Sequence, residues 1–363
     1  MNPDLPQNDV DLPSAMLLRR FPRASRGGWG AALRTDAAER ALPRAVRIVE
    51  VGPRDGLQNE PTFVPTDAKL AFVAALRAAG LAHIEAASFV SPKWVPQMRD
   101  AEAVMAGLAP LAAADGGVTF SALTPNMRGF ERAAALPATG EVAVFVAASE
   151  AFSRRNTNCS RDEALARAEP VARAARGAGV RLRGYVSTVL GCPYEGAVAP
   201  AAVAAAVRRL LDMGCAEVSL GDTIGAGTPR ATAALLRHLV DGDGGAPPAA
   251  RPDQLAAHFH DTHGCALANL LVALEFGVAT VDAAAGGLGG CPYAPGAAGN
   301  VATEDVVHML DGMGIATGVD LDRLVDAVAV ADDALARPPG AGSKTAAAVR
   351  ARRQRAAAAG AAA

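Results

Sequence analysis

The stretch Arg181–Leu220, RLRGYVSTVLGCPYEGAVAPAAVAAAVRRLLDMGCAEVSL, contains the pattern that decides the fold. Its first apolar run, Arg181–Ser187, predicts a strand, and the run Pro200–Met213, rich in Ala and Arg, predicts a helix. Gly214 follows that helix directly, as helix-ending glycines do, and the next apolar run is Glu217–Leu220. This succession of strand, helix and strand favours parallel strands joined by a helix.

The same succession recurs on both sides of this stretch. The other expected strands are Val46–Val51, His83–Ala87, Val118–Ala122, Val142–Ala147, Ala256–His260 and Thr280–Ala285. The other expected helices are Asp67–Ala79, Arg128–Leu136, Arg161–Ala178, Pro229–Val240 and Ala266–Phe276, with helix starts at Thr66-Asp67, Ser160 and Thr228. About eight units in one run predict an α/β fold of the (β/α)8 TIM-barrel type. A doubly wound sheet is the alternative, but no GxGxxG turn follows the first expected strand.

Composition excludes several classes of protein. The chain has 363 residues, of which 51% are hydrophobic and 20% are charged, so it can bury a large core. Its net charge of −2 gives no basic field for nucleic acid. Five scattered cysteines without CxxC spacing exclude a disulfide scaffold and a cysteine-rich zinc site. No apolar stretch is long enough to cross a bilayer, so no membrane partner is expected.

The two ends of the chain differ from its middle. Residues 1–43 are rich in Pro, Arg and Gly and predict a flexible N-terminal extension. Residues 44–337 then form the catalytic barrel, and residues 338–363 a C-terminal helix or disordered tail. Met16–Arg34 is Arg-rich and acid-free like a mitochondrial transit peptide, but three aspartates precede it. We therefore expect a bacterial cytoplasmic protein, with the mitochondrial matrix as the alternative.

Polar residues collect at the ends of otherwise apolar strands, where a β/α barrel carries its chemistry. They are Arg54, Asp55, Glu85, Asn126, Ser149, Glu150, Thr188, Cys192, Asp222, His258 and His260, with Cys291 in the glycine-rich loop after the last strand. This coincidence predicts a functional site at the C-terminal rim of the barrel.

The sharpest motif is His258-Phe259-His260. Alternate residues of a strand point to one face, so the two imidazoles can reach one cation. Asp55, after the first strand, is expected beside them once the barrel closes. Imidazole with carboxylate or amide oxygen suits a divalent ion of the Mg, Mn, Co or Zn series. The alternative is a pair of structural histidines, although two of only six histidines share this strand end.

Two further motifs carry candidate chemistry. Arg54 beside Asp55 is either a structural ion pair or, near a metal, a fixed cation for a carbonyl or enolate oxygen. The loop from Gly286 to Asn300 is so rich in glycine that we expect it to close over a ligand. Its candidate acid is Cys291, the alternative being an inert buried thiol. Asn300 and Glu304 follow near a helix start, where capping is the alternative.

With these motifs the chain resembles the 3-hydroxy-3-methylglutaryl-CoA lyase family from about Pro43 to Lys344. The stretches that carry the resemblance include VEVGPRDGLQNE (Val49–Glu60), HFHDTHGCALANLL (His258–Leu271) and GGLGGCPYAPGAAGNVATEDVVHML (Gly286–Leu310). The last is specific to this lyase and its near relatives, whereas the first two extend to Claisen-type synthases, aldolases and carboxyltransferases. His263 departs from the Tyr expected in the animal enzymes.

The resemblance implies a carbon–carbon lyase that cleaves 3-hydroxy-3-methylglutaryl-CoA to acetyl-CoA and acetoacetate, in leucine catabolism and ketone-body formation. It implies an acyl-CoA substrate, a divalent cation (usually Mg or Mn) and a homodimer. The implied metal ligands are Asp55, His258, His260 and Asn300. The implied catalytic residues are Arg54, Cys291, Asp222, His258 and Glu85, and the implied substrate-binding residues are Arg54, Glu85, Gln58 and Glu304.

Other activities stay open at this point. A lyase for a longer or branched 3-hydroxyglutaryl-CoA would carry the same motifs. A condensing synthase would normally carry a C-terminal regulatory domain after the barrel. An inactive binding barrel would be expected to have substitutions at Arg54, Asp55 or Cys291, and a metallohydrolase would need an activated water.

Overall fold

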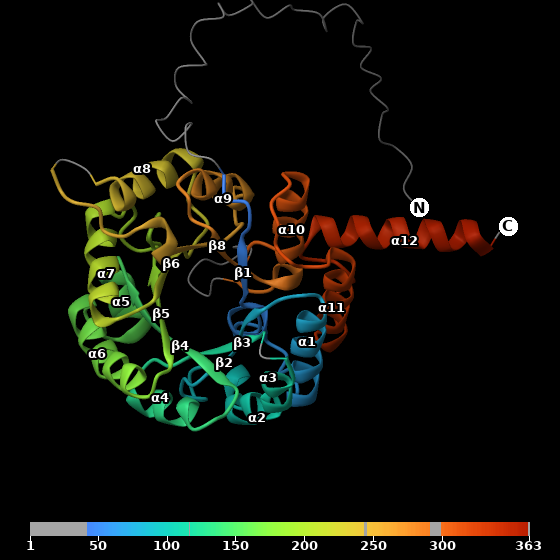
Figure 1. Ribbon diagram of the computed structural model, residues 1–363, viewed down its shortest axis with the longest axis horizontal. Coiled ribbons are helices and arrows are strands. Elements are labelled where there is room, and N and C mark those ends of the chain that lie inside the picture. Colours follow the sequence, from blue (N-terminus) through green and yellow to red (C-terminus); the bar gives the residue numbers. More distant parts are fainter. Residues whose placement is uncertain (1–41, 116, 243–244, 291–298, 362–363) are drawn as a thin grey trace, which may run out of the picture. The chain divides into compact units, whose positions relative to one another are not determined.

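Eight parallel strands form a closed barrel in the computed structural model, which describes residues 42–115, 117–242, 245–290 and 299–361. The strands neighbour one another in chain order, and the first pairs with the last (Figure 1). They are β1 (Arg47–Glu50), β2 (His83–Ser88), β3 (Thr119–Leu123), β4 (Thr139–Ala147), β5 (Arg181–Ser187), β6 (Glu217–Asp222), β7 (Leu255–Phe259) and β8 (Thr280–Ala283). The predicted (β/α)8 barrel is confirmed, and the doubly wound sheet is wrong.

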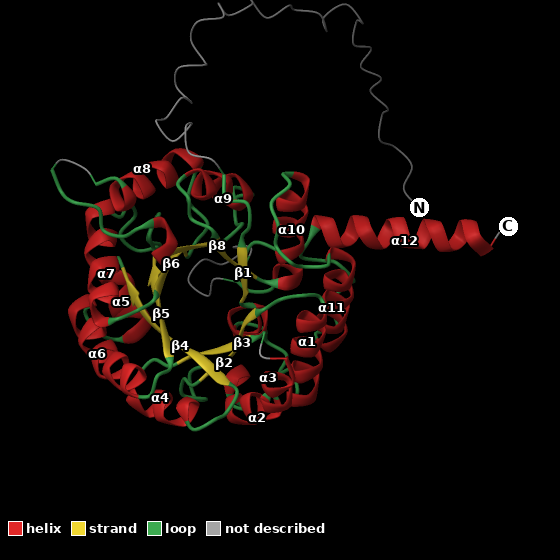
Figure 2. Cartoon of the chain, in the orientation of Figure 1, coloured by secondary structure: helices red, strands yellow, loops and turns green. Residues whose placement is uncertain are grey.

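Helices surround the ring of strands (Figure 2). They are α1 (Thr66–Ala78), α2 (Ala101–Gly107), α3 (Ala109–Asp115), α4 (Met127–Ala134), α5 (Glu150–Thr157), α6 (Arg161–Gly177), α7 (Pro200–Met213), α8 (Pro229–Val240), α9 (Ala266–Glu275), α10 (Thr303–Gly312), α11 (Leu321–Ala334) and α12 (Lys344–Ala361). The strands are buried on both faces, as parallel strands covered by helices must be.

Local sequence accounts for several helix boundaries. Ser160 begins α6 with a reciprocal capping box, in which its Oγ accepts from Glu163 N (3.1 Å) and Glu163 Oε2 accepts from Ser160 N (2.7 Å). Thr228 Oγ1 caps α8 by accepting from Ala231 N. The predicted starts at Ser160 and Thr228 are confirmed. Helix α1 has Pro65 at its cap position instead, with no side-chain cap bond.

No predicted helix range covers α2, α3, α5, α10 or α11, although a helix start is expected near Glu304, where α10 begins. The first two are only 7 residues long each, too short for an apolar period to show. The last two follow β8 with no strand between them, so the alternation of strand and helix no longer marks them. Strand β7 also ends at Phe259, one residue early, because His260 forms an antiparallel bridge with Asn300.

The C-terminal helix α12 packs against α11 through Val325, Ala346 and Val349 and then extends away from the barrel (Figure 1). Arg353 joins the two helices by ion pairs to Asp322 and Asp326. The proposed N-terminal extension lies outside the described residues except for residues 42 and 43. In the part of the chain that the structure describes, no helix is long and apolar enough to span a membrane.

Candidate functional site

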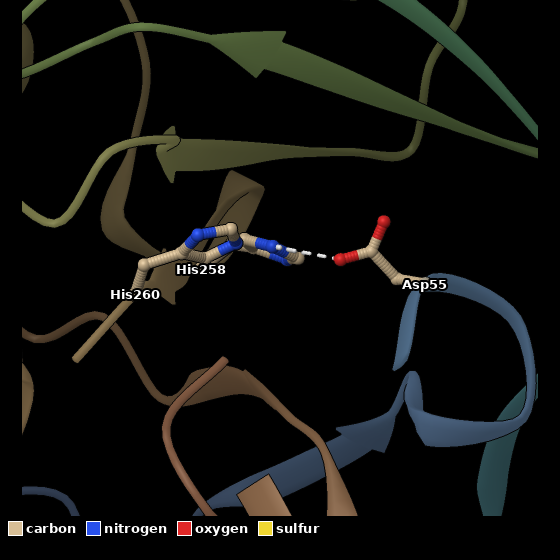
Figure 3. A group of neighbouring side chains, drawn as sticks. All are labelled: Asp55, His258 and His260. Atoms are coloured by element: carbon tan, nitrogen blue, oxygen red, sulfur yellow. Dashed lines mark ion pairs between the residues drawn. The ribbon is translucent and has the colours of Figure 1, made fainter. Parts of the chain in front are cut away.

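Three side chains that could hold a metal ion meet at the C-terminal end of the barrel. His258 lies on β7, His260 directly follows it, and Asp55 comes from the π-helical turn η2 (Gly52–Gly56) after β1 (Figure 3). One ligand atom from each lies within 4.8 Å of the other two. His258 Nε2 is 3.7 Å from Asp55 Oδ2, and both imidazoles are buried. The closure of the barrel places β1 two strands from β7, with β8 between them.

Asn300 is brought to the same place by the chain that returns after the glycine-rich loop. Its backbone bridges to His260, and its Nδ2 donates to Asp55 Oδ2 (3.0 Å) and to the Leu288 carbonyl (3.2 Å). Its Oδ1 is buried and has no hydrogen-bond partner. A buried amide oxygen without a partner is costly, so this atom is available as a ligand.

The charge states of these groups also fit a divalent cation. Burial opposes ionisation of Asp55, but Arg54 and the two imidazoles lower its pKa to about 2. Burial, followed by repulsion from His258, lowers the pKa of His260 to about 4, and its Nδ1 has no hydrogen-bond partner. At neutral pH the site therefore offers a carboxylate and an unprotonated imidazole nitrogen, the forms that bind metals.

Arg54 lies beside this group and is held from several sides. Its Nε donates to Glu85 Oε2 (2.6 Å) and its Nη1 to Asp55 Oδ1 (2.5 Å). Its guanidinium carbon lies 5.4 Å from the centre of the Tyr185 ring, and Tyr185 Oη donates to Glu85 Oε2 (3.1 Å). Burial alone would lower the pKa of Arg54, but the carboxylates of Glu85 and Asp55 raise it. A fixed, permanent cation thus stands next to the candidate metal ligands.

The family model HMGL-like matches residues 45–330, a range that includes all eight strands of the barrel. The chain belongs to the HMGL-like family.

Three named relatives of this HMGL-like chain are between 35% and 52% identical to it. It is 51% identical to the mitochondrial hydroxymethylglutaryl-CoA lyase of Rattus norvegicus over 313 residues, which cover 86% of this chain and 93% of the relative. The crystal structure of the Pseudomonas aeruginosa lyase matches with a TM-score of 0.79 at 52% identity, over 86% of this chain and 99% of the other. A lyase from Acinetobacter baumannii, solved in complex with coenzyme A and 3-methylmalate, matches with a TM-score of 0.75 at 35% identity. The match covers 84% of this chain and 97% of the other.

Asp222 and Gln58 are predicted site residues, and Asp222 has local hydrogen-bond partners in this HMGL-like barrel. Asp222, the last residue of β6, accepts N–H bonds from Ala226 (3.1 Å) and Gly227 (2.8 Å). Burial raises its pKa to about 6, although both hydrogen bonds lower it. His258 lies close enough to lower this pKa as well. Gln58 is half-buried, next to Asn59, whose Nδ2 donates to the Gly290 carbonyl (2.8 Å).

Glu304, at the start of α10, contacts the backbone of Gly286. Both of its carboxylate oxygens are 3.0 Å from Gly286 N, and the side chain is fully buried. Burial raises its pKa to about 8, and the nearby carboxylate of Glu50 adds to the rise. Residues 291–298 are outside the described residues, so the predicted acid Cys291 has no place in this geometry.

The expectation that the strands are apolar away from the rim is wrong. Charged residues are buried in four strands: Arg183 and Asp282 lie inside β5 and β8, Glu217 is the first residue of β6, and Glu50 is the last residue of β1. Asp282 hydrogen-bonds His258 Nδ1 (3.1 Å) and pairs with Arg183. These residues were missed, although a charged residue in the middle of an apolar run is itself a signal, since buried charges need partners.

Proposed function

We propose that this chain is a carbon–carbon lyase that cleaves 3-hydroxy-3-methylglutaryl-CoA to acetyl-CoA and acetoacetate. The observation that carries the proposal is the meeting of Asp55, His258 and His260 beside Arg54, in a chain 51% identical to a named lyase of this activity. The cation would be held by these three residues and Asn300 Oδ1, and we propose Mg or Mn because carboxylate and amide oxygens suit hard ions.

The reaction breaks the bond between C2 and C3 of the acyl group. The 3-hydroxyl loses its proton, its carbon becomes the ketone of acetoacetate, and the electron pair moves to the thioester as an enolate. A proton added at C2 completes acetyl-CoA, so no net proton is gained or lost. A divalent cation in the site supplies Lewis-acid polarisation that lowers the pKa of the hydroxyl group.

Arg54 would stabilise the enolate oxygen. Its guanidinium is already fixed by Glu85 and Asp55, so it needs little reorganisation when charge develops. Glu85 acts here by orienting Arg54, and with Gln58 and Glu304 it completes the proposed set of substrate-binding residues.

Two proton transfers need a base and an acid. Asp222 or His258 would take the hydroxyl proton, and the pKa of about 6 at Asp222 suits a base near neutral pH. Cys291 would give the proton to C2, since an ordinary thiol pKa of about 8.5 makes it a usable acid. We expect Cys291→Ser to bind metal like wild type and to lose nearly all turnover.

The proposed substrate is an acyl-CoA, in line with the coenzyme A bound to the Acinetobacter baumannii lyase. We also propose a homodimer and a cytoplasmic location, with the mitochondrial matrix as the alternative. Sedimentation of the purified protein tests the first and fractionation of the source cells the second.

The deciding experiment is an assay of the purified chain with 3-hydroxy-3-methylglutaryl-CoA, Mg or Mn, with and without EDTA. Equal amounts of acetyl-CoA and acetoacetate, abolished by EDTA, would support the proposal. Absence of cleavage with both metals, together with cleavage of a longer or branched 3-hydroxyglutaryl-CoA, would replace the substrate and keep the metal centre.

A further inference from the structure

Asp282 lies on β8 in register with His258 of β7, is 1% exposed, and has none of the roles above. We propose that Asp282 is a positioning residue that holds the His258 ring with its proton on Nδ1, so that the Nε2 lone pair faces Asp55. This inference rests on the proposed metal site at Asp55, His258 and His260.

The two nitrogens of His258 lie between two carboxylates at different distances. Nδ1 is 3.1 Å from Asp282 Oδ2, within hydrogen-bond range, whereas Nε2 is 3.7 Å from Asp55 Oδ2, beyond it. A neutral imidazole carries one N–H, and the nitrogen with the hydrogen-bond acceptor keeps it. The proton therefore belongs on Nδ1, and Nε2 is left as the ligand atom.

Asp282 is itself held in place by other donors. Arg183 pairs with both of its oxygens, at 3.0 Å and 2.6 Å, and Ser219 Oγ donates to Oδ2 at 2.7 Å. With so many partners the carboxylate cannot rotate away from the imidazole. An acceptor fixed in this way also fixes the orientation of the ring that donates to it.

The same network reaches the other side of the site. Arg183 Nη1 donates to Tyr185 Oη (2.8 Å), and Tyr185 Oη donates to Glu85, the partner of Arg54. A continuous chain of buried hydrogen bonds therefore joins His258 to Arg54 through the barrel interior. The proposed metal ligand and the proposed enolate-binding cation are set by one framework.

The competing explanation is that Asp282 serves only as a counter-ion for Arg183. Glu217 provides the matched control, because it is also a buried strand carboxylate and accepts from Arg183 Nε (2.9 Å). Its other ion pair is with Arg47 instead of His258. A purely structural role for Asp282 predicts that loss of either carboxylate has the same consequences.

The experiment compares the full chain with Asp282→Ala, Asp282→Asn and Glu217→Gln. Mn²⁺ affinity is measured by titration of metal-free protein, and the tautomer of His258 by nitrogen NMR after selective labelling of the six histidines. We expect Asp282→Ala to weaken Mn²⁺ binding about 10–100-fold. Asp282→Asn keeps an acceptor oxygen and should weaken it less, while Glu217→Gln should lose thermal stability and keep wild-type affinity. The His258 Nδ1–H signal should be present in wild type and Glu217→Gln and lost in Asp282→Ala.

A wild-type His258 protonated on Nε2, or equal Mn²⁺ affinities in Asp282→Asn and Glu217→Gln, would overturn the inference. The comparison of Asp282→Asn with Glu217→Gln decides the matter even where Asp282→Ala does not fold. A wild-type chain that binds no Mn²⁺ but loses the Nδ1–H tautomer in Asp282→Ala would defeat the proposed metal site and leave the positioning of the ring intact.

Discussion

Arg54 is oriented before any substrate arrives, since Glu85 and Asp55 accept from different nitrogens of its guanidinium. A lysine at this position would keep the charge but could not span both carboxylates with a planar fork. The position of the charge, rather than its presence, therefore depends on arginine.

We predict that Arg54→Lys lowers kcat by about 10²–10³-fold, the range for loss of one fixed donor to a developing oxyanion. Steady-state kinetics with 3-hydroxy-3-methylglutaryl-CoA measures this. Arg132→Lys is the control, because Arg132 pairs with Glu102 on the surface, and its kcat should equal that of wild type. Retention of wild-type kcat by Arg54→Lys would contradict the assigned role.

Glu304 is a buried acid with a pKa of about 8, against an ordinary value of 4.5. Between pH 4.5 and about pH 8, Glu304 keeps its proton in the folded chain, whereas in the unfolded chain it has released that proton. Stability that is fully present below about pH 4.5 is therefore lost as the pH rises toward 8.

We predict that Glu304→Gln flattens the pH dependence of the melting temperature between pH 5 and pH 8, where wild type declines. The amide oxygen can still accept from Gly286 N, so this hydrogen bond is kept. Thermal melts across this range test the difference. Parallel curves for the two proteins would show that Glu304 does not titrate as proposed.

Among the elements, the turns after β1 and β8 are joined by one buried acid. Glu50 Oε1 accepts from Gly52 N (2.8 Å) and Ala285 N (2.9 Å), and its Oε2 accepts from Thr303 Oγ1 (2.6 Å). The turn that carries Arg54 and Asp55 is thereby fixed to the start of the glycine-rich loop. Two segments more than 200 residues apart in sequence share one anchor.

Two glycines at the C-terminal ends of α6 and α7 show how the backbone conformation determines whether a larger residue is tolerated. Gly214 ends α7 with φ of +102°, where a Cβ would also lie 3.0 Å from Arg176 Nη2. Gly177 is the last residue of α6, and a Cβ there would meet nothing within 4 Å. At Gly214 the left-handed backbone conformation, rather than helix propensity, is the reason that glycine is required.

We predict opposite changes in the free energy of unfolding for these glycines. Gly214→Ala should lower it by about 1 kcal/mol or more, whereas Gly177→Ala should raise it by up to about 1 kcal/mol. Urea unfolding measures both, and kcat should stay at the wild-type value in each. Stabilisation by Gly214→Ala would contradict the argument.

At the scale of the whole molecule, a bound cation would join segments that are far apart in the sequence. Its proposed ligands come from the turn after β1, from β7 and from the segment that follows the glycine-rich loop. A ligand that binds only the folded chain stabilises it by mass action, by about 2.7 kcal/mol at 100 times its dissociation constant.

We predict that Mn²⁺ raises the melting temperature of wild type and that EDTA reverses the rise. Asp55→Asn should abolish most of this effect, while His308→Ala, which changes an exposed histidine of α10, should keep it. An equal rise in Asp55→Asn would place the cation elsewhere.

Local sequence by itself determined the eight-fold alternation, most strand positions and the group Asp55, His258 and His260. Strand runs, helix starts and a two-residue spacing all depend on neighbours along the chain, which a sequence displays. Once the alternation predicts a parallel barrel, the residues at the strand ends are expected at one site, because parallel strands end at one rim.

Only the tertiary structure decided what supports that site. The network of Asp282, Arg183 and Tyr185 joins β8 to β5, strands that are not adjacent, across the barrel interior. Glu50 and Glu304 likewise gain their roles from turns brought together by barrel closure. Such contacts depend on strand tilt, side-chain direction and burial, which become defined only when the barrel is closed.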